Sequence, residues 1–274
     1  MTRSRMYAMT GIAALLFLFL NWAFADNMFT GAFWNSTTIS DGSIWTYVLL
    51  ALIVIGGYMQ AQRLPDTAQP IAITAATGDG QVDDPKFWKL LMGNIHYAIL
   101  WMPLRFFVGR DWLIAGEHKA RGDGWVDGGA ALKGYWTNAT TVPEGRPSAP
   151  AGTYEWYQSF LKYMLDHEWY TWFGKAIAYG EVLVGIGLIV GALVGIAAFF
   201  GTLMNFSFGL AGSASSNPVL FGLGVFLVLG WKTAGWIGID RYLLPKLGTP
   251  WGRLQKYSEP RQMPTGTQTG TARS

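Results

Sequence analysis

The sequence predicts an all-α integral membrane protein, in which a four-helix transmembrane bundle is preceded by two extra transmembrane helices. Of its 274 residues, 51% are hydrophobic and only 14% are charged, whereas soluble globular proteins carry about 25% charged residues. The 14 Trp are typical of chains that anchor at membrane–water interfaces. The 35 Gly favour closely packed membrane helices.

Composition also narrows the chemistry that this chain can perform. The absence of Cys excludes disulfides, thiolate catalysis, Cys-ligated iron–sulfur clusters and covalently attached haem. Only three His are present, so haem is not expected either. The net charge of +3 does not favour nucleic-acid binding. Redox chemistry would therefore need a diffusible cofactor, such as a quinone, or a partner subunit.

The first two predicted spans lie near residues 7–25 and 44–60, each about the length that a bilayer requires. The first also resembles a signal peptide, because Arg3 and Arg5 precede its apolar run and Ala23-Phe24-Ala25 follows it. We favour a retained anchor. Residues 1–85 then form a two-helix membrane region that ends in a polar, cytoplasmic loop.

The third span starts near Phe87 and reaches Lys119, with residues 86–96 partly along the interface. Residues 120–152 are rich in Gly and Pro and predict a large loop. Residues 154–172 are aromatic and amphipathic, which indicates an interfacial helix.

The last three spans follow from residue 173 onward. Residues 173–210 are almost continuously apolar and predict two spans joined by a turn near Gly191–Gly195. The final span runs from Pro218 to about Ile239. Residues 86–245 thus form a four-helix membrane domain with an outward loop at 120–172, and residues 246–274 form a basic, flexible cytoplasmic tail.

Basic residues predict the orientation, because Lys and Arg near membranes favour the cytoplasmic side. Arg3 and Arg5 lie at one end of the chain, and the basic 246–274 tail lies at the other. Six spans place both termini on one side. The predicted location is a bacterial or archaeal cytoplasmic membrane, crossed several times, with both termini cytoplasmic.

The third span carries many charges, and its helical periodicity indicates where they point. At 100° per residue, one stripe holds Arg105, Gly109, Trp112, Gly116 and Lys119. Charges in spanning helices normally face the bundle interior or a water-filled cavity. This helix is therefore predicted to be buried in the bundle.

Depth in the membrane suggests partners for these charges. Arg110 lies about eight residues, or ~12 Å, from the outer end of its helix, and Glu181 lies at a similar depth in the next span. We predict that Arg110, or failing that Arg105, pairs with Glu181. Arg105 lies near the level of Lys232, which indicates an anion site or separate acidic partners, with Asp240 a candidate.

Three interpretations of these buried charges stay open. They can be purely structural ion pairs, a polar pocket for a quinone head group or small anion, or an ion or proton pathway. No metal site is predicted, because the spacing of His118, His167 and their acidic neighbours matches no known ligand pattern.

Three segments, in order, resemble DoxX-type membrane proteins. RFFVGRDWLIAGEHK is similar to the first helix of that family, GEVLVGIGLIVGALVGIAA to its acidic, Gly-rich second helix and the turn into the third, and GWIGIDRYLL to the end of the fourth. The likeness covers about residues 97–245 and is nearest to the DoxD branch, the large subunit of a thiosulfate:quinone oxidoreductase. The N-terminal spans and the 120–172 insertion depart from the family pattern.

The resemblance implies that electrons pass from thiosulfate to a membrane quinone. The residues at motif positions are Arg105, Glu117, Lys119, Glu181 and Asp240. We predict catalytic roles for Glu181, Glu117 and Arg105, with Glu181 or Glu117 relaying protons. Cofactor binding is predicted for Arg105, Lys232, Trp112 and Arg110, because fixed cations stabilise an anionic oxygen.

The partners expected are the lipid bilayer and other membrane or extracytoplasmic subunits, because no DoxA-like domain is fused to this chain. The alternative is a non-catalytic accessory subunit of a larger respiratory or photosynthetic membrane complex.

Overall fold

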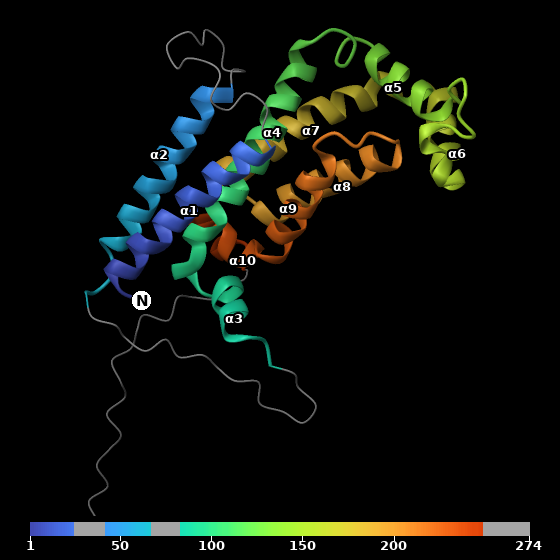
Figure 1. Cartoon of the computed structure of the whole chain (residues 1–274). Coiled ribbons are helices and arrows are strands. Elements are labelled where there is room, and N and C mark those ends of the chain that lie inside the picture. Colours follow the sequence, from blue (N-terminus) through green and yellow to red (C-terminus); the bar gives the residue numbers. More distant parts are fainter. Residues whose placement is uncertain (25–41, 67–82, 249–274) are drawn as a thin grey trace, which may run out of the picture.

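The computed structural model describes residues 1–24, 42–66 and 83–248, and within these ranges it is all-helical (Figure 1). The six long helices are α1 (Arg3–Phe24), α2 (Gly42–Ala61), α4 (Met102–Arg121), α7 (Tyr170–Val190), α8 (Val194–Leu210) and α9 (Asn217–Leu229). The short helices are α3 (Lys86–Gly93), η1 (Ile95–Trp101), α5 (Ala130–Thr140), η2 (Pro150–Thr153), α6 (Glu155–Asp166), α10 (Trp231–Ala234) and α11 (Asp240–Lys246).

The long helices run back and forth between two ends of the molecule. At one end, here named the Arg105 end, the N–H of Arg3 donates to the carbonyl of Pro65 at 3.2 Å. There the Gln60 amide also donates to the carbonyl of Ile95 at 2.9 Å. The start of α1, the end of α2 and η1 therefore lie together, as Figure 1 shows.

The other end, here named the Lys119 end, carries α5 and α6. Tyr157 donates its hydroxyl to the carbonyl of Ser207 at 2.9 Å, and Tyr135 donates to Phe208 at 3.4 Å. Burial raises the pKa of Tyr135 to about 12 and also raises the pKa of Tyr157. Both hydroxyls thus stay protonated, and their hydrogen bonds connect α5 and α6 to the end of α8.

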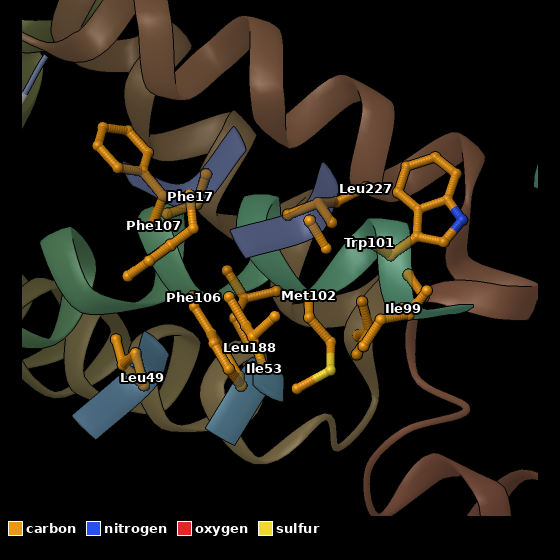
Figure 2. Packing of buried hydrophobic residues seen from close by; sticks show 14 of the residues in the cluster. Phe17, Leu49, Ile53, Ile99, Trp101, Met102, Phe106, Phe107, Leu188 and Leu227 are labelled. Carbon is orange, nitrogen blue, oxygen red and sulfur yellow. The ribbon is translucent and has the colours of Figure 1, made fainter. Parts of the chain in front are cut away.

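Buried apolar side chains hold α1, α2, α4, α7 and α9 together. Phe17 of α1 and Leu49 and Ile53 of α2 pack in one cluster with residues of α4 (Figure 2). Leu188 of α7 and Leu227 of α9 belong to the same cluster, and both are fully buried. The two N-terminal helices are thereby part of the same core as the remaining helices.

Helices α4 and α7 approach closely because glycines face the partner backbone. A Cβ built on Gly116 would lie 2.6 Å from the Val182 nitrogen, and one on Gly185 would lie 2.5 Å from the Leu113 nitrogen. No side chain larger than hydrogen fits at either position without moving a helix. These contacts put the charged stripe of α4 against α7.

The Gly185→Ala variant tests this close approach. The added methyl would meet the α4 backbone, and such overpacking typically costs about 1–3 kcal/mol. Gly180→Ala, in the same helix, is the matched control because nothing lies within 4 Å of its added Cβ. We expect Gly185→Ala to lower the thermal midpoint of the solubilised protein and Gly180→Ala to leave it unchanged or raise it.

Several expected segments agree with the structure, and two do not. The turn between the fourth and fifth predicted spans lies between Val190 and Val194, inside the predicted region. The 120–152 segment was predicted as a loop, but it contains α5. The last predicted span, to Ile239, is too long, because α9 ends at Leu229 and Gly230 packs directly on the Trp101 ring.

Two of the described helices, α1 and α7, are long and apolar enough to cross a membrane. Residues 45–61 within α2, together with α8 and α9, are shorter apolar stretches. This pattern weakly suggests membrane association. Residues 25–41, between the first two predicted spans, and most of the predicted 246–274 tail lie outside the described residues.

Candidate functional site

The charged stripe of α4 faces the bundle interior, as its periodicity predicted. Arg105, Gly109, Trp112 and Gly116 are all buried, and Lys119 is half-buried. Gly109 and Gly116 both lie against α7. Two separate sets of buried polar contacts lie along the stripe. One surrounds Arg105, and the other lies nearer the Lys119 end.

The group nearer the Lys119 end is built on Glu181. This side chain is completely buried, and its Oε2 accepts a hydrogen bond from Lys119 Nζ at 2.8 Å. The ammonium also lies over the Trp125 ring, 5.2 Å from its centroid. The Lys119 side chain is 20% exposed and so connects its ammonium group to the surface, whereas the Glu181 side chain has no exposed area.

The predicted pairing of Glu181 with Arg110 or Arg105 is wrong, although Glu181 is ion-paired. Arg110 instead donates to Asn21 Oδ1 of α1 at 2.7 Å. Arg110 was matched to Glu181 by predicted depth, but Gly116 is the α4 residue that packs beside Glu181, which leaves Arg110 about 9 Å away along the helix. Lys119 lies on the α7 side of α4, and its long side chain reaches back along the helix to the carboxylate.

Three buried side chains near this pair retain polar atoms with no hydrogen-bond partner. These atoms are Glu181 Oε1, Trp112 Nε1, and both Nδ2 and Oδ1 of Asn205. The three residues are 0%, 3% and 2% exposed, respectively. Buried polar groups in folded proteins nearly always have partners, so this concentration indicates a place where another polar molecule can bind.

Helix register places these three side chains near one another. A Cβ built on Gly201 of α8 would lie 2.9 Å from Trp112 Nε1 and 3.1 Å from a Val184 methyl group. Asn205 and Glu181 each lie about one turn from that contact, in the direction of the Lys119 end. The unpaired atoms therefore come from α4, α7 and α8 at neighbouring levels, and we name them the Glu181 site.

The second group, at the Arg105 end, surrounds a fully buried guanidinium. Arg105 donates to the carbonyls of Leu188 and Ile189 at the end of α7, at 2.8 and 3.0 Å. It also donates to Ala234 and Ile237 after α9, at 2.8 and 2.9 Å. These bonds satisfy carbonyls that a helix end otherwise leaves unpaired.

Asp240 completes this arrangement from the other side of the α7–α8 turn. Its two carboxylate oxygens accept from the N–H groups of Leu193 and Val194, at 2.6 and 2.9 Å, at the start of α8. A carboxylate at a helix N-terminus is favourable because the exposed N–H groups and the helix dipole attract negative charge. Arg105 and Asp240 thus stabilise opposite sides of one turn.

The remaining predicted site residues do not join the Glu181 site. Lys232, on α10, is exposed, and Glu117 forms an ion pair with the exposed Arg121 at 3.1 Å. Trp112 lies about one helical turn from the level of Glu181, whereas Arg105 lies at the opposite end of the stripe. The predicted binding roles of Arg105, Arg110 and Lys232 stay predictions, and the contacts of Arg105 favour a structural role.

Sequence reasoning missed Asn205. Its polar side chain could have identified it, because an amide in the middle of an apolar helix requires hydrogen-bond partners that the helix itself does not supply. Lys119 was identified as a motif residue, but its contact with Glu181 was not predicted.

Comparisons with protein-family models, with curated proteins and with solved structures gave no match. Membership of the DoxX-type family therefore stays a prediction based on the three sequence segments.

Proposed function

We propose that this chain is an integral membrane subunit of a quinone-linked redox complex, similar to DoxD, and that the Glu181 site receives a quinone head group. The observation that carries the proposal is the set of unpaired polar atoms on Glu181, Trp112 and Asn205. A quinone supplies a two-electron acceptor that takes up two protons on reduction.

The surface of the long helices supports a membrane setting. Large apolar side chains are exposed along α1, α7 and α8, among them Leu15 at 67% and Leu183 at 68%. Soluble monomers rarely expose large contiguous apolar patches. Multi-pass insertion into a bacterial or archaeal cytoplasmic membrane, with both termini cytoplasmic, belongs to the same proposal.

The chemistry of the three side chains fits the oxygens of a quinone head group. The Trp112 indole N–H and the Asn205 amide N–H are donors for carbonyl oxygens. The Glu181 carboxyl group can hold or release a proton next to them, and Lys119 balances its charge. Because Trp112 packs directly on Gly201, a head group can enter only if the indole turns or α8 moves outward.

Lys119 gives the Glu181 site a connection to the aqueous phase. Its ammonium contacts the buried carboxylate, and its side chain is partly exposed beside Trp125 at the Lys119 end. A proton leaving or reaching Glu181 would therefore pass on this side. In this proposal Glu181 is the proton-transfer residue, whereas Glu117 lies on another face of α4 and forms an ion pair with Arg121.

Quinone retention tests the proposal. Trp112→Phe removes the indole donor but keeps an aromatic ring, and Glu181→Gln removes the titratable group. Losing one hydrogen bond of about 1 kcal/mol lowers affinity roughly fivefold. We expect both variants, purified from membranes, to carry several-fold less quinone per protein than the parent, measured by extraction and mass spectrometry.

Trp172→Phe is the matched control, because Trp172 is 51% exposed at the start of α7. Equal quinone content in Trp112→Phe, Glu181→Gln and Trp172→Phe would contradict the proposal. Reduction of a quinone analogue by thiosulfate, with and without co-purified subunits, then tests the electron donor.

A second candidate function is that of an accessory subunit that packs against a larger respiratory or photosynthetic complex. The observation that favours it lies on α6, where Trp156, Phe160 and Tyr163 are exposed and follow helical spacing. In a native gel after gentle extraction, migration as a stable lone monomer would contradict the accessory role, and the quinone content of the purified chain then distinguishes the two candidates.

A further inference from the structure

A second site, remote from Glu181, lies at the Arg105 end of the molecule. A cavity of about 280 Å³ lies between the end of α2, η1 and the start of α11. Typical small-molecule sites are about 300–1,000 Å³, so this cavity has room for a head group rather than a whole lipid. None of the residues that line it belongs to the Glu181 site.

Two arginines line the cavity from distant parts of the chain. Arg63 follows α2, and Arg241 lies in the first turn of α11. Within residues 1–24, 42–66 and 83–248, neither arginine takes part in an ion pair. His96 of η1 lies on the same wall. The cavity therefore has positive charge that the described part of the chain does not neutralise.

Aromatic contacts orient one of these arginines. The Arg241 guanidinium lies 5.0 Å from the centroid of the Trp236 ring and 5.7 Å from that of Tyr242. Cation–π contacts of this kind restrict a guanidinium without using its N–H donors. The donors of Arg241 thus remain available for a planar or tetrahedral anion, and Arg binds phosphate oxygens with two parallel hydrogen bonds.

The remainder of the lining is suited to an amphiphile rather than to a bare ion. Met59, Leu64 and Ile237 supply apolar walls. Gln60 donates its amide N–H to Ile95, while its Oε1 is buried without a partner. That oxygen is an acceptor for a ligand hydroxyl group, which a glycerol head group carries next to its phosphate.

We propose that this cavity binds the phosphate group of an anionic phospholipid, with Arg63 and Arg241 on the phosphate and Gln60 on a head-group hydroxyl. That the bound phosphate belongs to a lipid rests on the proposed membrane location, but the site does not depend on quinone binding. Basic pockets between membrane helices on the cytoplasmic side bind anionic head groups in this way. The predicted orientation places the Arg105 end on that side.

Binding of short-chain phosphatidylglycerol to the full, solubilised chain tests the proposal, with short-chain phosphatidylcholine and inorganic phosphate as parallel ligands. The Arg63→Gln/Arg241→Gln variant removes both charges. We expect it to weaken phosphatidylglycerol binding at least roughly tenfold, because hydrogen bonds from charged donors are stronger than those between neutral groups. Arg5→Gln/Lys246→Gln is the matched control, because both residues are exposed basic residues outside the cavity lining.

The control is expected to keep parental affinity within about threefold, since exposed charges contribute little. A third variant, Arg63→Lys/Arg241→Lys, keeps both charges and should bind better than the Gln variant even if the latter folds poorly. Stronger binding of phosphatidylglycerol than of the other two ligands supports the proposal. Equal affinity for inorganic phosphate overturns the lipid source, and equal loss in the cavity and control variants overturns the site.

Discussion

Replacing Arg105 with Met is expected to remove most of the folding stability of this protein. The side chain is 1% exposed and donates to four backbone carbonyls. Each buried acceptor left without a partner costs about 1–3 kcal/mol, so the loss should be at least ~4 kcal/mol. Whole proteins are stable by only about 5–15 kcal/mol, and we expect little folded protein to be recovered.

The matched control is Arg121→Met in the last turn of the same helix. Its side chain is 75% exposed and forms only the surface ion pair with Glu117, so the expected cost is below about 1 kcal/mol. Arg105→Lys should be intermediate, since an ammonium cannot reproduce the planar arrangement of donors. Thermal unfolding and folded yield in detergent measure all three. A stable Arg105→Met variant that lost only quinone binding would show that Arg105 belongs to the ligand site.

The second large effect is expected at the Lys119–Glu181 pair. Lys119→Met leaves the fully buried Glu181 carboxylate without a cation. Removing one partner of a buried ion pair costs about 3–5 kcal/mol, and the partial exposure of Lys119 places the expected loss near the lower limit. Glu181→Gln should cost less, because Lys119 can turn toward solvent.

A double-mutant cycle measures the coupling between the two residues. Lys119→Met/Glu181→Gln is expected to be more stable than Lys119→Met alone, because the double variant buries no uncompensated charge. Lys175→Met, an exposed lysine in the helix that carries Glu181, serves as the control. Additive effects of the two substitutions would contradict a direct, energetically coupled ion pair.

The sequence was sufficient to predict the helical class and the buried face of α4. Periodicity relies on local geometry, so the stripe from Arg105 to Lys119 could be placed on one side of a helix before any tertiary contact was known. The turn between α7 and α8 was predicted from length, because the apolar run of residues 173–210 is too long for a single span.

Side-chain partners were less predictable, because they depend on how helices are rotated about their axes. Arg110 and Glu181 were matched by predicted depth, but α4 packs on α7 with Gly116 beside Glu181, and Arg110 instead contacts Asn21 of α1. Arg105 and Lys232 were likewise matched by predicted depth, but only Arg105 is buried. Long-range carbonyl contacts, such as those from Arg105 to Ala234 and Ile237, leave no periodic pattern in the sequence.

The end of the last predicted span was missed for a packing reason. The segment after Leu229 remains apolar enough to continue a helix, yet Gly230 lies against the Trp101 ring and the chain turns there into α10. This turn places Ala234 and Ile237 within reach of Arg105. The same turn brings Asp240 to the start of α8.

Photolabelling with an azido-quinone in membranes tests whether the Glu181 site receives a quinone head group. Mass spectrometry of the labelled chain locates the modified residues. We expect labels near Trp112 on α4, Glu181 on α7 and Asn205 on α8, and we expect both competing quinone and Trp112→Phe to reduce them. Labels confined to the exposed outer faces of α1, α2 or α9, unaffected by competitor, would contradict it.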